Sequence, residues 1–416
     1  MAYSNSFERK VGGISHPLMS VATFLLCVFA TNADLGSNRL VWWGSVGFFV
    51  LSWLLTSDMK LSLDLKYTMW IISFFGFAAC SVFWAISVSL VTNTLKSAIV
   101  HVLVLLLLRS SIKTKDDIDR MVLIIIWTSI VNSVYIFAIS FSSIISSMGG
   151  DYADRLGTAE GWNANSVGMM AAVGALFAIY YMLRTRKTSM KIILFLVACG
   201  MVFVSLMSGS RKAFLIVLVG IAAYLFLVSG KRRLTSFLLL AAFALVLIFV
   251  VMKVPFFYSI IGWRIDGMLE SLLGNGSGDA SFQNRKILIS AAIDAWKREP
   301  IFGHGLDCFR TFGKIAADGK NYYAHNNYLE LLADLGIIGA SIYYSAHFYV
   351  AKKLLKRFKE KDHTAMLLLT LLGTMLIIDF ACVSYVDFLF EIVIMILFAF
   401  ITIQDAEKKG EIGCCQ

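Results

Sequence analysis

The sequence has little charge, little proline and no cysteine pairs with a recognisable spacing. Charged residues make up 15% of the 416-residue chain, and there are only three prolines. With so little proline and no alternating ten-residue segments, the pattern argues against an outer-membrane barrel, whose strands would alternate apolar and polar residues. The seven cysteines show neither disulfide nor zinc spacing, so we interpret them as small apolar residues, with weak potential for palmitoylation at Cys414 and Cys415.

Motifs of several enzyme classes are also missing. The chain has no phosphate-binding P-loop, no GxSxG nucleophile motif and no HExxH zinc motif. ATP hydrolysis, serine hydrolysis and zinc proteolysis therefore lack their usual residues. A clear two-half repeat with glycine-broken helices is absent as well, and this disfavours a secondary transporter.

What the chain does contain is a series of long apolar runs. Hydrophobic residues make up 58% of the sequence, and the mean hydropathy is +0.76. A helix of about 17–25 apolar residues crosses a hydrocarbon core of roughly 30 Å. We therefore predict an all-α polytopic membrane protein with about twelve transmembrane helices in a single domain, 1–416. The predicted spans are Leu18–Asn32, Leu40–Thr56, Tyr67–Leu90, Val91–Leu108, Met121–Ser147, Asn165–Leu183, Ile192–Met207, Ala213–Ser229, Thr235–Met252, Asn326–Val350, Thr364–Cys382 and Leu389–Ile403.

The basic residues indicate how these helices are oriented. The formal net charge is +10, and the lysines and arginines gather in alternate loops, so we expect no nucleic-acid partner. The positive-inside rule places those loops and both termini in the cytoplasm. Because no small-residue cleavage site precedes a long apolar run, we expect no removed signal peptide. The basic groups include Arg9/Lys10, Lys60/Lys66, Lys113/Lys115/Arg120, Arg184/Arg186/Lys187/Lys191, Lys231/Arg232/Arg233, Lys352/Lys353/Lys356/Arg357 and Lys408/Lys409.

The long loop between the ninth and tenth spans, residues 253–324, is then extracytoplasmic. Loops of this length without structure are uncommon, so we expect short helices that lie over the membrane face. One of them is predicted at Asn284–Lys297. The glycine-rich turn Pro300–Leu306 would let the backbone approach a ligand, and we expect His304 within it to face solvent.

His325 stands where that loop enters the tenth span. An imidazole suits proton exchange at neutral pH because its reference pKa is about 6.5. A structural reading is also open, in which Asn327 and Glu330 form a helix capping box. In that reading Gly336 and Gly339 pack against a neighbouring helix.

Two arginines on the same side favour an anionic ligand. Arg211 follows a Ser-Gly-Ser turn and adjoins Lys212, on the side where positive charge is disfavoured. An arginine at membrane depth costs about 2.5–3.5 kcal/mol, whereas an anion at about 4 Å returns roughly 4 kcal/mol at an effective dielectric of about 20. Arg285 opens the predicted loop helix, whose N-terminus would also favour an anion. The alternatives are snorkelling or pairing with Glu160 for Arg211, and a solvated surface charge for Arg285.

Arg155 and Asn165 are weaker candidates for the same site. They supply a guanidinium and an amide suited to sugar hydroxyls or phosphate, on the same side of the predicted membrane. Alternatively, Asn165 caps its own helix.

The order of these motifs resembles a known family. His325-Asn326, then nine residues, then Gly336-Ile337-Ile338-Gly339 is similar to the signature of the O-antigen ligase and polysaccharide polymerase superfamily. The Ser-Gly-Ser-Arg turn, the Arg285 helix and the glycine-rich turn at 300–305 occur in that family's order. The resemblance covers mainly residues 150–350 together with the twelve-span plan. It implies a glycosyltransferase of the bacterial cytoplasmic (inner) membrane with its active site at the outer face.

The resemblance also implies roles for individual residues. The enzyme would transfer glycan from an undecaprenyl-diphosphate-linked donor to a sugar hydroxyl, with no cofactor and no required metal. His325 would be the general base, and Arg211 and Arg285 would hold the diphosphate. Weaker substrate contacts would come from Arg155, Asn165, Lys212, Asn326 and Arg310.

Polymerase and ligase share these motifs. The runs His325–Leu331 and Gly305–Arg310 look more like capsule and exopolysaccharide polymerases than like lipid A-core ligases, so we prefer a polymerase. Its acceptor would be a lipid-linked repeat unit, whereas that of a ligase would be lipid A-core. The expected partners also include membrane lipid and a chain-length regulator. A transporter of lipid-linked oligosaccharide or anionic solute is the second alternative.

Overall fold

The protein is helical throughout the residues that the structure describes, and no strand occurs among them. The computed structural model describes residues 13–30, 39–57, 61–147, 153–230, 233–273, 280–317, 319 and 322–409. The all-α class predicted from the sequence is confirmed. Some predicted residues lie outside the described ranges, namely Arg9, Lys10, Lys60, Lys231, Arg232, Cys414 and Cys415.

Helices occupy all the predicted spans. Within the described ranges, nine helices are long and apolar enough to cross a membrane, and three further apolar helices are shorter. The nine are Leu65–Phe83 (α3, Leu65–Cys80, with the turn that follows), Val88–Ser111 (α4), Lys115–Ser147 (α5), Ala164–Arg184 (α6), Thr188–Met207 (α7), Arg211–Val228 (α8, Arg211–Leu215, and α9, Ile221–Val228), Leu234–Lys253 (in α10, Arg233–Lys253), Asn327–Phe358 (α15) and Phe388–Lys408 (α17). The shorter ones are α1 (Pro17–Ala30), α2 (Arg39–Thr56) and α16 (His363–Ile378).

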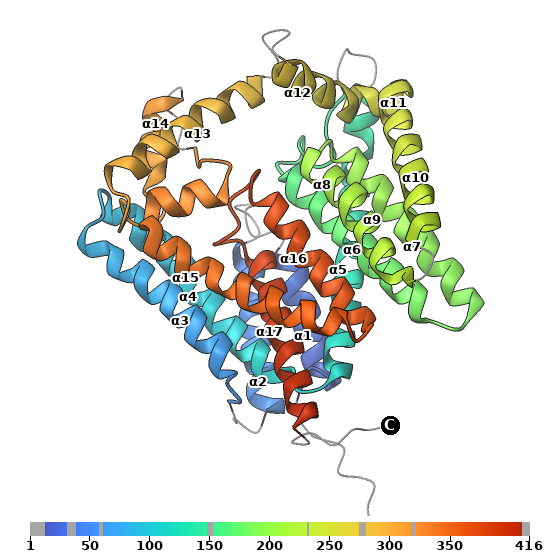
Figure 1. The fold of residues 1–416 in the computed structure, drawn as a ribbon, viewed down its shortest axis with the longest axis horizontal. Coiled ribbons are helices and arrows are strands. Elements are labelled where there is room, and N and C mark those ends of the chain that lie inside the picture. Colours follow the sequence, from blue (N-terminus) through green and yellow to red (C-terminus); the bar gives the residue numbers. More distant parts are fainter. Residues whose placement is uncertain are drawn as a thin grey trace, which may run out of the picture.

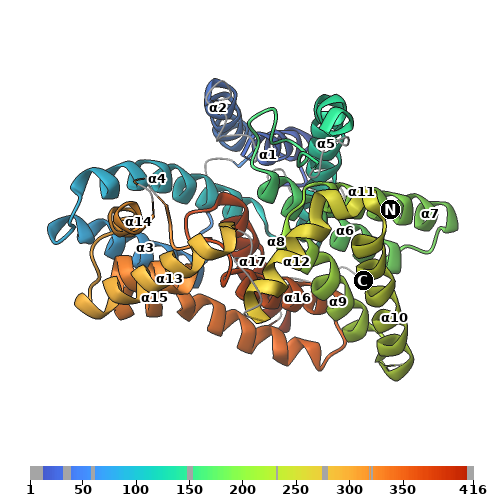
Figure 2. The same cartoon turned by 90° about the horizontal axis from the view of Figure 1, so that it is seen from above.

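The core of the bundle is built on α6 and α17. Of their most apolar windows, 61% of α6 and 72% of α17 are buried inside the protein, against 6% of α10. Figures 1 and 2 show α17 in the middle of the bundle and α10 at its edge. The apolar surface of α10 is therefore left for lipid, as expected of a helix that contacts the rest of the protein along little of its length.

The third span ends earlier than predicted. The prediction ran it through residues 67–90, but α3 ends at Cys80 and α4 begins at Val88. The apolar turn between them packs on another loop of the protein, where Trp84 Nε1 donates a hydrogen bond to Phe302 O at 3.2 Å. Hydropathy alone missed the turn because its residues, such as Phe83 and Ile86, are as apolar as those of the helices on either side.

The helix α15 is broken at Gly336, which has φ 63° and ψ −168°. A Cβ at this position would lie 2.2 Å from Ile301 O, so both the conformation and the space require glycine. The expectation that Gly336 packs against a neighbouring helix is therefore wrong, because it meets a loop. Gly339 does face a helix, since a Cβ there would lie 3.2 Å from Phe77 of α3.

The loop at residues 300–305 supplies the backbone hydrogen bonds that the break removes from α15. Non-helical backbone at membrane depth is tolerated where protein buries it and satisfies its polar groups. The glycine-rich turn and the broken helix therefore form one structural unit. The bonds run from His304 N to Ala333 O (3.0 Å), from Gly305 N to Asp334 O (2.8 Å) and from Ile337 N to Pro300 O (2.9 Å).

Short helices fill the segment between α10 and α15, as predicted. Two of them, α12 and α13, run across one end of the bundle (Figure 1). The helix predicted at Asn284–Lys297 begins earlier, at Ala280, so Arg285 lies inside α13 and not at its N-terminus. The helix dipole is therefore not what would bring an anion to Arg285. The short helices are α11 (Pro255–Phe257), a π-helical turn (Tyr258–Gly262), α12 (Trp263–Leu273), α13 (Ala280–Arg298) and α14 (Phe309–Ala316).

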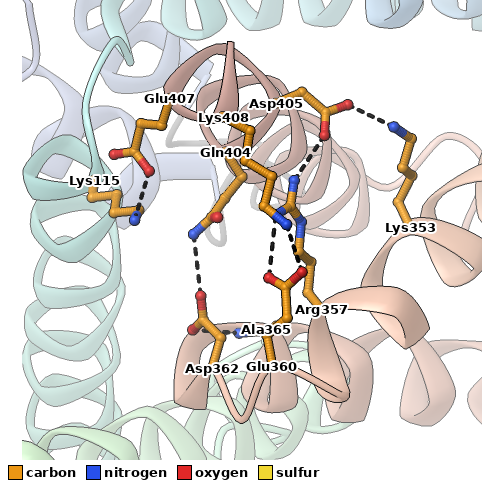
Figure 3. A network of polar contacts seen from close by, with 10 residues as sticks. All are labelled: Lys115, Lys353, Arg357, Glu360, Asp362, Ala365, Gln404, Asp405, Glu407 and Lys408. Carbon is orange, nitrogen blue, oxygen red and sulfur yellow. Dashed lines mark hydrogen bonds and ion pairs between the residues drawn. The ribbon is translucent and has the colours of Figure 1, made fainter. Parts of the chain in front are cut away.

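The opposite end of the bundle carries a network of ion pairs (Figure 3). Arg357 of α15 donates to Asp405 of α17 at 2.8 Å, and Lys353 lies 2.6 Å from the other oxygen of the same carboxylate. Lys115 at the start of α5 pairs with Glu407 at 2.7 Å. Because α15 and α17 reach this end with their C-termini, these basic residues lie far from the end that α12 and α13 cover.

Candidate active site

His325 lies in the turn that leads into α15. Its backbone has φ 53°, a left-handed conformation that is uncommon for a residue other than glycine. Its imidazole packs on the ring of Tyr323 with the two centroids 4.2 Å apart. Imidazole Nδ1 is buried and has no hydrogen-bond partner among the described residues. Structural hydrogen bonding therefore leaves that nitrogen unused.

Asn326, and not Asn327, caps α15. Asn326 Oδ1 accepts a hydrogen bond from Leu329 N at 3.0 Å. Glu330 does not reach the backbone N–H of the capping residue, and accepts instead from Ala324 N, two residues before the cap. The predicted capping box is therefore wrong. A substrate contact by Asn326 stays a prediction, and its side-chain oxygen already serves the cap.

Asn327 is fully buried and ties the His325 turn to the connection between α16 and α17. Its N–H donates to Asp379 O at 2.7 Å. Its Oδ1 accepts from Ser384 N at 2.8 Å and from Tyr385 N at 3.2 Å. The start of α15 and the last connection at this end of the bundle are therefore held in one arrangement.

A tight turn places Arg211 and Lys212 at the start of α8. Gly209 in this turn has φ 57°, and a Cβ there would lie 2.9 Å from Ile260 O, so the turn requires glycine. Arg211 donates to Arg264 O at 3.3 Å, and Lys212 is buried with 7% of its surface exposed. The turn thus brings two basic side chains into a mostly buried position.

Glu160 is not held by Arg211, its predicted alternative partner. Both of its carboxylate oxygens accept hydrogen bonds from α5, from Ser140 at 2.7 Å and from Ser143 at 3.1 Å. Glu160 therefore anchors its own loop to α5.

Arg155 is fixed by two acceptors. Its Nε donates to Ser208 O at 2.8 Å, and its terminal nitrogen donates to Asn165 Oδ1 at 2.9 Å. Asn165 does not cap α6, as one alternative proposed, because Asn163 is the capping residue. Asn165 instead orients the guanidinium of Arg155.

Several positive charges gather at this end of the bundle. Burial and nearby positive charge lower the pKa of Arg155 to about 10, and the charges responsible are those of Arg264, Arg211 and Arg285. Lys212 also lies within electrostatic reach of Arg285 and Arg155. We call this group the basic cluster: Arg155, Arg211, Lys212, Arg264 and Arg285. Arg264 was missed from the sequence, although it stands, like Arg211, on the side where basic residues are disfavoured.

His325 lies beside the basic cluster. Burial, and then the positive charges of Arg285 and Lys212, lower the pKa of His325 to about 3. Three separate stretches of chain therefore meet here: the start of α8, the first turns of α13 and the turn before α15. The result is a place suited to an anion next to a neutral imidazole.

These three stretches lie in a region of the chain that is similar to a known protein family. Residues 201–344 match the protein-family model described as O-antigen ligase. This part of the chain is similar to the O-antigen ligase family. The matched region, 201–344, contains His325 and every member of the basic cluster except Arg155. The resemblance found in the sequence is thereby confirmed, and members of this family are glycosyltransferase-like enzymes. No curated protein matches the chain.

Arg310, which also lies in the matched region, belongs to a different network. Its Nε donates to Asp307 Oδ1 at 2.6 Å, and Asp307 also accepts from Thr94 of α4 at 2.7 Å. A substrate contact by Arg310 stays a prediction. His304 is buried, and its Nε2 lies 2.9 Å from Ala295 O, so the expected solvent exposure is wrong.

An apolar cavity of ≈ 100 Å³ extends from this end into the bundle between α5, α6, α16 and α17. Met170, Leu371 and Phe390 are among the residues that line it, and Asp387 is its one charged lining residue. Asp387 caps α17 and lies within electrostatic reach of Lys212. The apolar space therefore begins next to the basic cluster.

Proposed function

We propose that this protein is a polymerase that joins polyprenyl-diphosphate-linked oligosaccharide repeat units of a surface polysaccharide. The observation that carries the proposal is the basic cluster beside His325, most of it inside the region that matches the O-antigen ligase family. The site would face outward from the cytoplasmic membrane, since the ion-pair network with its lysines and arginines lies at the opposite end. The chain would act as one integral membrane domain, with both termini in the cytoplasm.

In this proposal Arg211 and Arg285 hold the diphosphate of the donor. A guanidinium can donate to two phosphate oxygens at once, and each such contact is strong where water is excluded. At an effective dielectric of about 20, one pair of opposite charges at about 4 Å is worth roughly 4 kcal/mol. The apolar cavity beside Lys212 and Asp387 suits a donor whose carrier is a lipid.

The reaction step needs one proton transfer. The acceptor hydroxyl oxygen bonds to the anomeric carbon of the donor glycan while the bond from that carbon to the diphosphate oxygen breaks. The hydroxyl proton passes to the imidazole of His325, and the electron pair of the broken bond stays on the diphosphate. The positive charges that held the diphosphate now stabilise the charge that develops on it, so this step asks for no acid catalyst and no metal ion.

The same positive charges explain how His325 becomes a better base when the donor binds. In the empty site burial and the charges of Arg285 and Lys212 hold the pKa of His325 near 3, so the imidazole is neutral but a weak base. A bound diphosphate offsets those charges, and the pKa rises towards the value that suits a base at neutral pH. Donor binding would therefore activate the base.

Polymerase and ligase differ only in the acceptor. The family description names O-antigen ligase, whereas the runs His325–Leu331 and Gly305–Arg310 favour a polymerase. Purified protein with a polyprenyl-diphosphate oligosaccharide decides between them. Longer lipid-linked glycan chains indicate a polymerase, and glycan transferred only when lipid A-core is added indicates a ligase.

The same assay separates an enzyme from a transporter, because a transporter leaves the glycan unchanged in detergent. We expect His325→Ala to abolish transfer while donor binding is retained. Full turnover in that variant would remove His325 from its role as base. A wild-type protein that binds the donor but transfers nothing would overturn the proposed function.

A further inference from the structure

Among the residues that the structure describes, no carboxylate orients His325. No side chain in the described part of the chain hydrogen-bonds its Nδ1, and the charges that act on its imidazole are positive. In many sites a carboxylate or a backbone carbonyl fixes the ring of a functional histidine. Here another part of the structure must hold the imidazole in place.

The backbone is tied down on both sides of His325. Before it, Ala324 N donates to the carboxylate of Glu330. After it, Asn327 N donates to Asp379 O at 2.7 Å. His325 itself has φ 53°, a conformation that persists only where its surroundings impose it. The conformation of this turn is therefore set by its neighbours.

Packing does not explain why residue 330 of this arrangement is a glutamate. Its side chain is fully buried, as is Ala324. One carboxylate oxygen accepts from Ala324 N, and the other, Oε1, has no hydrogen-bond partner in the ranges that the structure describes. A buried carboxylate with an unsatisfied oxygen is costly, so stability alone gives no reason for an acid at this position.

We propose that Glu330 is a positioning residue for His325. Its carboxylate holds the N–H of Ala324, the residue between Tyr323 and His325, and thereby fixes both rings. Tyr323 packs on the imidazole, and the left-handed backbone of His325 turns the ring towards the basic cluster. The inference rests on the proposed function, because the position of the imidazole matters for the reaction only if His325 accepts the proton.

Asp334 provides a matched comparison one turn further along α15. It is fully buried like Glu330, and it also accepts backbone hydrogen bonds, from Phe309 N at 2.6 Å and Asp307 N at 3.0 Å. Those bonds hold the start of α14, and the carboxylate also accepts from the Tyr385 hydroxyl at 3.0 Å, but none of them reaches the backbone of Ala324 or His325. A change at Asp334 is therefore expected to affect folding without moving the imidazole.

The test compares variants of the full-length protein with a polyprenyl-diphosphate oligosaccharide as donor. Glu330→Leu removes the acceptor for Ala324 N, and a displacement of about 1 Å at a catalytic group costs about 100-fold, so we expect kcat to fall about 100-fold with the donor KM little changed. Glu330→Gln keeps an acceptor oxygen and is expected to stay within about fivefold of wild type. Asp334→Asn is expected to lower the melting temperature while the folded protein keeps its kcat.

A second readout follows the imidazole itself. With ¹³C-labelled histidine, the His325 signal is expected to titrate closer to its ordinary pKa in Glu330→Leu, because the ring leaves the basic cluster. Glu330→Asp, whose shorter side chain withdraws the acceptor but keeps the carboxyl group, serves if the leucine variant does not fold. It is expected to show the same loss of kcat and the same change in titration.

The outcomes separate this inference from the proposed function. An unchanged kcat and an unchanged His325 titration in folded Glu330→Leu or Glu330→Asp would overturn the positioning role and leave the function intact. An equal loss of kcat in Asp334→Asn would overturn it as well, since any buried acid of α15 would then have the same effect. A wild-type protein without transfer would overturn the proposed function.

Discussion

The pKa of His325 offers the sharpest test of the site. We predict that the imidazole stays unprotonated down to about pH 4 in the free protein, because burial and the charges of Arg285 and Lys212 lower its pKa to about 3. Relative to the ordinary value of about 6.5, this shift corresponds to about 5 kcal/mol against protonation. Replacing one positive neighbour tests how much of the shift is electrostatic. At an effective dielectric of about 20, a unit charge at roughly 8 Å contributes about 2 kcal/mol, so Arg285→Gln is expected to raise the pKa by about 1.5 units.

The measurement is a ¹³C-histidine titration of the purified protein. The chain has six histidines, and the His325 signal is identified by its loss in His325→Gln. In the free protein the signal is expected to stay constant from pH 8 to about pH 4, and added pyrophosphate is expected to move its midpoint upward by more than one unit because two or more negative charges offset the basic cluster. A midpoint near 6.5 without ligand would refute the buried, positively charged environment. No change with pyrophosphate would refute its binding beside the imidazole.

Four further predictions follow from particular contacts. Gly336→Ala is expected to prevent a stable fold, because its Cβ would lie 2.2 Å from Ile301 O, whereas Gly373→Ala, with no atom within 4 Å, is expected to keep or slightly raise the melting temperature. Asp64→Ala is expected to cost about 3–5 kcal/mol in thermal unfolding, because Arg109, 2.9 Å away and also buried, loses its carboxylate partner; a variant that melts like wild type would contradict this pairing. Arg285→Lys is expected to lower kcat/KM about tenfold and Arg285→Ala about 100-fold, since lysine keeps the charge but loses the bidentate contact with the diphosphate; equal losses in the two variants would argue against a bidentate contact. Chelation with EDTA is expected to leave the initial rate of transfer unchanged, because the basic cluster offsets the charge on the leaving diphosphate; a rate restored only by added Mg²⁺ would contradict it.

The membrane spans could be predicted from the sequence because a hydrocarbon layer demands long apolar runs wherever a helix crosses it. The prediction was wrong where an apolar segment is not part of a helix. The turn containing Trp84 reads as part of a span, yet it joins two helices and is hydrogen-bonded to the loop at Phe302. The break at Gly336 was missed because the loop that replaces its hydrogen bonds comes some thirty residues earlier in the chain.

The candidate site was predicted in part. Arg211 and Arg285 could be singled out because basic side chains are disfavoured on that side of a membrane protein, and His325 because of its place between loop and span. Arg264 carried the same signal and was overlooked. Glu330 and Asn327 were singled out from the sequence only as a capping box, because their actual partners, such as Asp379, are brought near only by the fold.

The break in α15 has a consequence for how the protein is made. The carbonyl of Pro300 and the N–H groups of His304 and Gly305 find their partners only at residues 333–337. Until α15 is in place, water must satisfy these polar groups of the earlier loop. The loop at residues 300–305 can therefore reach its final conformation only after the later helix has formed.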